Sequence, residues 1–99
     1  MKQANISYNE ELNELHIVFK EVEIPIIFEL DNNVLLEFDD DTLCSIVLPN
    51  FSNMLKMPIN VQTAFTLSDL KIVDEIMTIT MNVNGEININ INVNVSSLK

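Results

Sequence analysis

The residues best suited to chemistry in this sequence are a single histidine, a single cysteine and several carboxylates. His16 lies between Leu15 and Ile17 in an alternating apolar stretch, and the chain has no second histidine to share a metal ion. We therefore expect a hydrogen-bonded imidazole on a strand, with a catalytic base as the alternative. Cys44 also lies in an apolar stretch without a basic neighbour to stabilise a thiolate. This context favours a structural thiol over a nucleophile.

Carboxylates are concentrated in two segments of the first half of the chain. The partner-binding candidates that they provide are Glu10, Glu11, Glu14, Glu37, Asp39, Asp40 and Asp41. The second segment is also the nearest approach to a cation site. It lacks the glycine turn and the regular ligand spacing of a calcium loop, which favours a solvated turn over a weak Ca²⁺ or Mg²⁺ site.

The sequence contains no glycine-rich phosphate loop, no G-x-S-x-G nucleophile elbow and no paired set of zinc ligands. These motifs would point to phosphoryl transfer, acyl transfer or a metal centre. We therefore predict a protein that is not an enzyme and that uses no cofactor and no metal.

The charge composition limits the classes of partner. The 99 residues include 15 Asp plus Glu and 5 Lys plus Arg, which gives a formal net charge of −10. Because all the basic residues are lysines, an arginine-based phosphate surface is excluded and no direct nucleic-acid binding is expected. Most of the acidic residues precede residue 58, so a basic protein partner would be steered toward the first half.

A chain of this length allows one domain, 1–99, with a modest core. Hydrophobic residues make up 47% of it, too many for a disordered acidic tail, and no apolar run is long enough to cross a membrane. A lone cysteine cannot form an intrachain disulfide, so homo-oligomerisation is the expected support for the small core. The start of the chain lacks the features of a secretion signal, which with the lone thiol predicts a cytoplasmic location.

Apolar residues alternate with polar ones over most of the chain, a pattern typical of β-strands. We predict a mainly β fold, a small antiparallel sheet or sandwich of six to eight strands with at most one or two short helices. Helices are expected over 51–57, capped by Asn50 or Ser52, and over 68–75, which has an N-cap signal and amphipathic spacing. Residues 59–67 alternate like a strand.

Face alternation also predicts the pairing of strands in the first half. A hairpin of 5–8 with 15–19, joined by the loop 9–14, places Tyr8 opposite Leu15. A second hairpin of 22–30 with 34–38, joined by 31–33, places Phe28 opposite Leu36, and Pro25 puts its first strand at an edge or marks its start. After a turn at 39–42, residues 43–48 are apolar on both faces and are expected to form a central strand.

The clearest pattern is a long hairpin at 76–95. A loop of Val83, Asn84 and Gly85, with Gly85 left-handed, pairs Met81 with Ile87 and Ile79 with Ile89. The residues expected to share one buried face are then Met77, Ile79, Met81, Ile87, Ile89 and Ile91. The opposite face is rich in asparagine and carries one charge, so this strand lacks the usual protection of an edge. The oligomer-edge candidates are Ile87, Ile89, Ile91 and Val93.

Two blocks of the first half resemble a known family. Residues 6–19, ISYNEELNELHIVF, are similar to the pattern I-x-Y-D-x-E-x-D-x-L-Y-I, and residues 34–48, VLLEFDDDTLCSIVL, are similar to V-x-x-D-Y-D-x-D-G-x-L-V-G-I-E-I-L. These patterns belong to the domain of unknown function 2283 family of small bacterial proteins, which the chain resembles over residues 5–52. Asn9 and Asn13 replace the usual aspartates, His16 the tyrosine and Ser45 the second glycine, and the turn glycine is missing with one residue deleted.

The resemblance implies a β meander over 5–52, with 53–99 as an extension that ends in the hairpin 76–95. Members of the family have no established enzymatic activity, and some are encoded beside small basic ribonuclease-like toxins. The leading expectation is therefore an acidic, antitoxin-like protein-binding module that neutralises a small basic protein such as a toxin nuclease. The alternatives are a nucleic-acid mimic of the phage-inhibitor type, which inhibits a DNA- or RNA-binding enzyme, and a structural homo-oligomerisation domain whose charge serves solubility.

Overall fold

Two antiparallel sheets and one short helix make up the part of the chain that the structure, a computed structural model, describes: residues 4–30, 32–55, 57–60 and 62–96. The elements are Asn5–Asn9 (β1), Glu14–Val18 (β2), Ile26–Glu29 (β3), Leu35–Asp39 (β4), Thr42–Leu48 (β5), Phe51–Leu55 (α1), Phe65–Val73 (β6), Ile76–Val83 (β7) and Ile87–Asn94 (β8). The predicted mainly β fold with six to eight strands is confirmed.

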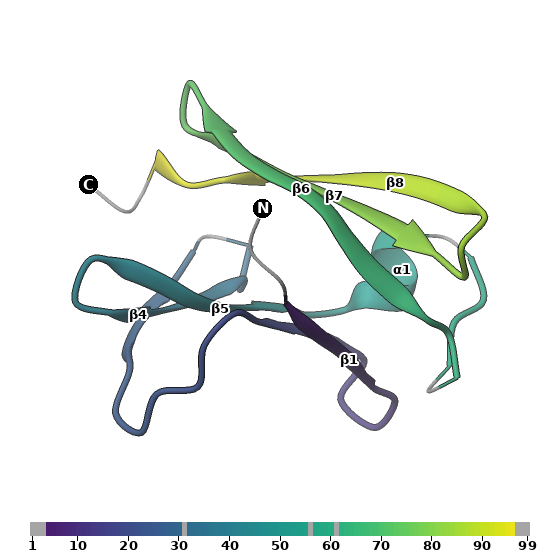
Figure 1. The fold of residues 1–99 in the computed structure, drawn as a ribbon, viewed down its shortest axis with the longest axis horizontal. Coiled ribbons are helices and arrows are strands. Elements are labelled where there is room, and N and C mark those ends of the chain that lie inside the picture. Colours follow the sequence, from purple (N-terminus) through teal and green to yellow (C-terminus); the bar gives the residue numbers. More distant parts are fainter. Residues whose placement is uncertain (1–3, 31, 56, 61, 97–99) are drawn as a thin grey trace.

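The strands form a sandwich of two sheets. The larger sheet has the order β1-β2-β5-β4-β3 and the smaller the order β6-β7-β8, and neighbouring strands are antiparallel. Figure 1 shows the smaller sheet stacked over the larger one, with α1 at one end of the stack. Each sheet therefore has an inner face toward the other sheet and an outer face turned away from it. None of the described helices has the length and apolar character needed to cross a membrane.

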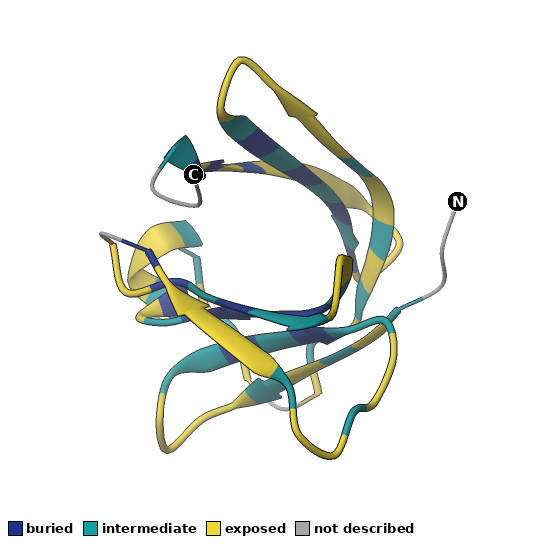
Figure 2. Ribbon diagram, turned by 90° about the vertical axis from the view of Figure 1, so that its left-hand side faces the viewer, coloured by how far each residue is buried: buried dark blue, intermediate teal, exposed yellow. Residues whose placement is uncertain are grey.

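Hydrophobic side chains from the two inner faces form one core. β7 contributes every second residue, because its side chains alternate between the inner and outer faces. Figure 2 shows the buried residues along the facing surfaces of the two sheets. The buried core residues are Leu15, Ile17, Leu30, Val34, Leu36, Ile46, Leu48, Phe51, Met77, Ile79, Met81, Ile91, Val93 and Val95.

The first hairpin has the predicted register. Tyr8 pairs with Leu15, as the alternation of apolar residues required. The strands continue for one further pair, Asn9 with Glu14, so the loop spans 10–13 and not 9–14. The tighter loop depends on Asn13, whose φ of 54° is a conformation that asparagine tolerates better than most residues.

The second hairpin also has the predicted register, because Phe28 pairs with Leu36. β3 begins directly after Pro25 and lies at the edge of its sheet, as expected for a residue without an amide proton. Residues 22–24, which the pattern included in this strand, precede it. Of the predicted loop 31–33, Asp31 lies outside the described residues.

β5 is the central strand of the larger sheet and is buried on both faces over its last five residues, which confirms the prediction for 43–48. The turn before it is tighter than the predicted 39–42. Asp39 pairs with Thr42, which leaves Asp40 and Asp41 as a two-residue turn, with Asp40 at a φ of 53°. A β-bulge follows, so that Cys44 has no partner on β4.

The helix predicted over 68–75 is wrong, because these residues form the end of β6 and a tight turn. The pairing of β6 with β7 contains a bulge. Leu67 pairs with Met81 and Leu70 with Ile79, so β6 has one residue more than β7 between these two pairs. The bulge therefore places Leu67 and Leu70 on the same side of a strand at a spacing that otherwise indicates a helix. The strand predicted over 59–67 is wrong for most of its length, because β6 begins only at Phe65. The described residues before it form a turn around Asn60. Val61 lies outside the described residues.

α1 ends at Leu55, within the predicted 51–57; residue 56 lies outside the described residues. Asn50 occupies the predicted N-cap position, because its carbonyl accepts from the Met54 amide at 3.2 Å, but its side chain accepts from the Asn53 side chain and not from a helix amide. The backbone carbonyl of Asn13 accepts from the Phe51 amide at 3.0 Å, and the Oδ1 atom of Asn13 accepts from the Ser52 amide at 3.0 Å. The amino end of α1 is thus capped by a residue of the β1–β2 loop, which lies far away in the sequence.

The register predicted for the last hairpin is wrong by two residues. Val83 pairs with Ile87 and Met81 with Ile89, so the loop is 84–86 and not 83–85. A shift of two residues keeps every side chain on its face, so the apolar residues still share the inner face. They are not all buried, however, because Ile87 at the loop end is 47% exposed.

The left-handed conformation predicted for Gly85 is confirmed by its φ of +73°. A Cβ atom added there meets nothing within 4 Å, so substitution changes backbone strain and little else. We expect Gly85→Val to lower the free energy of unfolding by about 1–2 kcal/mol, since a β-branched residue is disfavoured at positive φ. Chemical denaturation should show a smaller loss for Gly85→Asn. Equal losses for the two variants would contradict this explanation.

The asparagine-rich outer face of β7 and β8 is tied across the pair by side-chain hydrogen bonds. Thr78 donates to Asn92 at 3.0 Å, Thr80 to Asn90 at 2.8 Å, and Asn82 to Asn88 at 3.2 Å. Cross-strand pairs of this kind stabilise an exposed sheet face without charge. These asparagines therefore have a structural role within the chain.

Candidate functional site

The outer face of the larger sheet carries the Glu14 and Glu37 carboxylates, and the smaller sheet does not cover it (Figure 1). Strand pairing and alternation assign its residues, since inward-facing Leu15 and Ile17 leave their neighbours on β2 pointing outward. We call this surface the outer face. Its central residues are Ser7, Asn9, Glu14, His16, Val18, Glu37, Ser45 and Val47.

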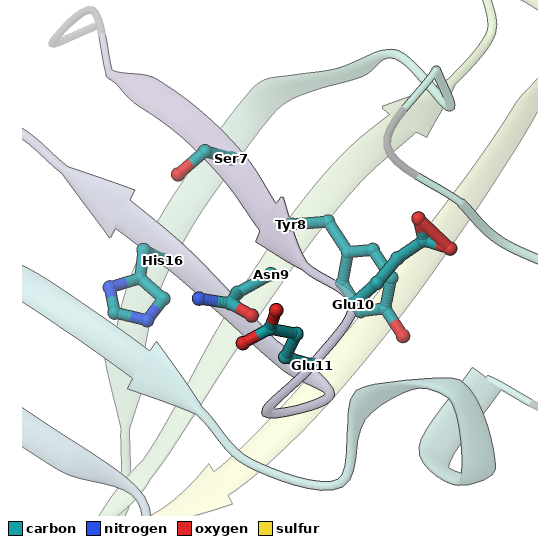
Figure 3. Close-up of a pocket in the computed structure, with 6 residues that line it drawn as sticks. All are labelled: Ser7, Tyr8, Asn9, Glu10, Glu11 and His16. Atoms are coloured by element: carbon teal, nitrogen blue, oxygen red, sulfur yellow. The ribbon is translucent and has the colours of Figure 1, made fainter.

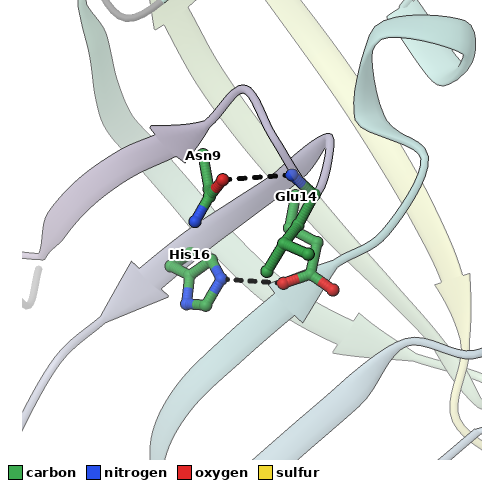
Figure 4. Close-up of polar contacts among 4 residues, drawn as sticks. Asn9, Glu14 and His16 are labelled. Atoms are coloured by element: carbon green, nitrogen blue, oxygen red, sulfur yellow. Dashed lines mark hydrogen bonds and ion pairs between the residues drawn. The ribbon is translucent and has the colours of Figure 1, made fainter.

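His16 lies at the centre of the outer face, as the alternating pattern placed it on a strand. Its Nε2 atom is 3.1 Å from the Oε1 atom of Glu14, and the two side chains are 39% and 28% exposed (Figure 4). Ser7 is the residue opposite His16 on β1. Among the described contacts, no hydrogen bond joins the Ser7 hydroxyl to the imidazole, which is the contact that a serine nucleophile requires. The geometry thus describes a partly exposed imidazole held by one carboxylate.

Two shallow hollows meet at His16. One is lined by Ser7, Tyr8, Asn9, Glu10, Glu11 and His16. Figure 3 shows the side chains of Asn9, Glu11 and His16 gathered on one side of β1, while the ring of Tyr8 points away from them. The other is lined by His16, Val18, Lys20, Glu21, Val22, Glu37, Ser45 and Val47. The outer face therefore offers polar and carboxylate groups beside partly buried valine side chains, a mixture found at protein-binding surfaces.

The first acidic group comes from the β1–β2 loop. Glu10 and Glu11 are exposed at its tip, and Glu14 follows at the start of β2, beside His16. Asn9 holds the loop by accepting from the Leu12 amide at 3.1 Å (Figure 4). A loop held in this way keeps its carboxylates at the rim of the outer face.

The second acidic group comes from β4 and its turn. The Glu37 carboxylate accepts from the Ser45 hydroxyl at 2.7 Å, and the Asp39 carboxylate is 2.7 Å from the Nζ atom of Lys20. The hydrogen bond that Lys20 donates to Asp39, assisted by the negative charge of Asp39, raises the pKa of Lys20 above its ordinary value. The ion pair is solvent-exposed, so it contributes little to stability, and that contribution is lost as the pH rises through the raised pKa. Asp40 and Asp41 point to solvent in the turn.

The structure places the two acidic groups at opposite ends of the outer face. Leu15, next to Glu14, pairs with Leu48 at the end of β5, whereas Asp39 pairs with Thr42 at its start. The length of β5 separates the groups by about 20 Å. Within the second group, Glu37 lies nearest the middle of the face, because it pairs with Ser45. The seven candidate residues therefore belong to one face but do not form one patch.

Neither metal nor thiol chemistry is assembled in the described part of the chain. Its histidine, cysteine and carboxylate side chains form no group of three that could hold a metal ion. The Cys44 thiol is buried and donates to the Thr42 carbonyl at 3.3 Å. Asp40 and Asp41 form the exposed turn between β4 and β5, and the Cys44 side chain is buried within β5.

The predicted oligomer-edge residues have different environments. Ile91 and Val93 are 5% and 1% exposed and pack into the core of their own chain, so their side chains cannot contact a second copy. Ile87 is exposed and Ile89 is partly buried. The exposure of the apolar residues of β3 and of the segment before it was not predicted, since the alternating pattern only placed them on the apolar face of a hairpin. The proline that marks the strand start was the available signal that this strand lies at an edge.

Comparisons with protein-family models, with curated proteins and with solved structures found no match for this chain.

Proposed function

We propose that the protein is a non-enzymatic binding module that recognises a basic protein through the outer face of the larger sheet. The observation that carries the proposal is the arrangement of carboxylates at both ends and in the middle of a sheet face that the other sheet does not cover. The Lys20 ammonium on this side is paired with Asp39 and neutralises only that carboxylate. Such a surface attracts a cationic partner and repels acidic ones. The partly buried side chain of Val18 would supply apolar contact area between the charges.

The resemblance of residues 5–52 to the domain of unknown function 2283 family gives this proposal a direction. We propose an antitoxin-like role, in which the acidic face covers a small basic protein such as a toxin nuclease. A cytoplasmic location is part of the same proposal, because the single cysteine suits a reducing compartment. The partner would bury carboxylates only where its own lysines or arginines pair with them.

Capture of the partner from native lysate, followed by mass spectrometry, is the first experiment. The immobilised wild type is compared with Glu10→Lys/Glu11→Lys and with Asp40→Lys/Asp41→Lys. The matched control is Asp69→Lys/Glu86→Lys, which makes the same change of charge at exposed positions of the smaller sheet. We expect the first two variants, but not the control, to lose a basic protein. Displacement of that protein by duplex DNA would assign the surface to nucleic-acid mimicry.

Association kinetics of the captured partner provide a quantitative prediction. Each outer-face double reversal should slow association by about tenfold at low salt while changing dissociation less, since exposed charges act mainly on encounter. Raising the salt toward physiological strength should slow wild-type association, because the Debye length falls to about 8 Å. Surface plasmon resonance at two salt concentrations measures both effects. An association rate that ignores salt and charge reversal contradicts the proposal.

A further inference from the structure

β3 is an edge strand with apolar side chains exposed on both of its faces. Ile26 and Phe28 on the inner side are 50% and 42% exposed, and Ile27 on the outer side is 56% exposed. Ile24, just before the strand, is 88% exposed. Natural edge strands are usually protected by lysine, by proline within the strand or by a bulge, and β3 has Pro25 only before its first residue. This exposure is unlike that of β8, whose apolar residues mostly turn into the core.

The backbone of β3 presents hydrogen-bonding groups at its free edge. The Leu30 amide donates to the Val34 carbonyl at 2.9 Å, so the backbone N–H and C=O groups of Leu30 face β4. Backbone groups alternate in direction along an antiparallel strand, which turns those of Ile27 and Glu29 away from β4. Among the described backbone contacts, neither residue has a partner on that side. The edge is therefore able to accept another strand.

The surroundings of the edge favour a cationic occupant. A hollow beside it is lined by Phe28, Phe38, Asp40 and Asp41. The two rings meet edge-to-face with their centroids 5.5 Å apart. Aromatic rings beside carboxylates form a suitable environment for a lysine or arginine side chain. A second copy of this chain would instead bring Glu29 and the aspartate turn against the same groups, at a net charge of −10 for each copy.

We propose that an extended segment of the basic partner pairs with the free edge of β3 as a sixth strand of the larger sheet. The segment would alternate apolar residues with lysine or arginine, so that its apolar side chains cover Ile27 on the outer side and a cationic side chain on the inner side enters the hollow beside Phe28. Main-chain bonds to Ile27 and Glu29 would provide affinity, and the hollow would provide specificity. This inference rests on the proposed function and assigns the docking edge that the partner uses.

Proline at position 27 tests the edge directly. Ile27→Pro removes an amide that faces the free edge and leaves the bonds to β4 intact, whereas Ile27→Ala removes the side chain and keeps the amide. Ile27→Lys is the second variant, because it needs no change in the backbone and repels a cationic strand. We expect Ile27→Pro and Ile27→Lys to bind the captured partner at least about tenfold more weakly than Ile27→Ala does, at unchanged thermal stability.

A synthetic peptide of alternating lysine and valine, about eight residues long, tests the chemistry without the partner. Its control alternates lysine with serine, which keeps the charge and removes the apolar side chains. We expect the first peptide, and not the control, to slow amide hydrogen exchange at Ile27 and Glu29. Protection confined to residues of the outer face such as Ser7 and His16 would overturn the edge inference.

The outcomes separate this inference from the proposed function. If the partner binds Ile27→Pro as tightly as wild type but is lost by the outer-face charge reversals, the edge inference is wrong and the proposed function stands. If the peptide protects the edge but charge reversal leaves capture unchanged, the proposed function is wrong. A wild-type dimer that Ile27→Pro converts to a monomer in sedimentation experiments would show that a second copy occupies the edge, which also overturns the inference.

Discussion

Replacing Phe51 by alanine should lower the free energy of unfolding by about 3–5 kcal/mol, the usual loss when a buried phenylalanine leaves a cavity. Phe51 is the first residue of α1 and is fully buried. Its ring lies 5.6 Å from that of Phe65 and 6.3 Å from that of Tyr8, measured between centroids, so it joins one strand of each sheet to the helix. Urea denaturation followed by circular dichroism measures the change.

Phe28→Ala is the matched control for this prediction. It makes the same substitution at a half-exposed position of β3, where removal of the ring opens no cavity. We expect a loss of about 1 kcal/mol or less there. Since a domain of this size is stable by about 5–15 kcal/mol, Phe51→Ala should remove a large part of its stability. Similar losses for the two variants would show that Phe51 does not join the sheets as described.

Sequence analysis predicted the local hairpins of the first half because each depends on a short loop and on face alternation. Tyr8 opposite Leu15 and Phe28 opposite Leu36 both follow once the apolar faces are required to coincide. Face alternation does not fix the register of the last hairpin, because loops of 83–85 and 84–86 keep identical faces. The observed loop has Asn84 and Gly85 both left-handed, with φ values of 55° and 73°. Turn conformation, and not alternation, decided that register.

Features that depend on contacts between distant segments were not accessible from the sequence. The bulge in β6 gives Leu67 and Leu70 a helical spacing, and only its pairing with β7 identifies it as a strand. The candidate acidic residues were recognised individually, but their separation follows from the insertion of β5 between β2 and β4. The exposure of Ile27 likewise depends on where β3 lies in its sheet. The helix cap by Asn13 joins residues that are 39 positions apart.

Asn13→Ala is expected to cost about 2–3 kcal/mol, although Asn13 is only partly buried. Its Oδ1 atom accepts from the Tyr8 hydroxyl at 2.6 Å and from the Ser52 amide at 3.0 Å. Alanine removes both of these bonds, together with a longer one of 3.4 Å that the Asn13 Nδ2 atom donates to Asn50, and it also strains the backbone at a φ of 54°. Chemical denaturation measures the total, and Tyr8→Phe measures the hydroxyl bond alone.

Two substitutions at the same position separate the causes. Asn13→Asp retains a side-chain acceptor for Tyr8 and Ser52 and should cost about 0.5 kcal/mol or less. Asn13→Gly relieves the backbone but loses both bonds, so it should fall between aspartate and alanine. If glycine restores full stability, backbone strain alone explains the loss and the bonds from Asn13 contribute little.

The Asn13 series also connects the fold to the proposed binding surface. Asn13 ends the loop that carries Glu10 and Glu11, and its bonds fix that loop to β1 and α1. We expect Asn13→Ala to raise amide hydrogen exchange in residues 10–13 and to slow association with the basic partner, while Asn13→Asp leaves the exchange unchanged and, with its added carboxylate, does not slow association. Because every carboxylate is retained in Asn13→Ala, a slower association would come from the position of the charges and not from their number. An unchanged association rate beside faster exchange would show that the first acidic group acts only through long-range attraction.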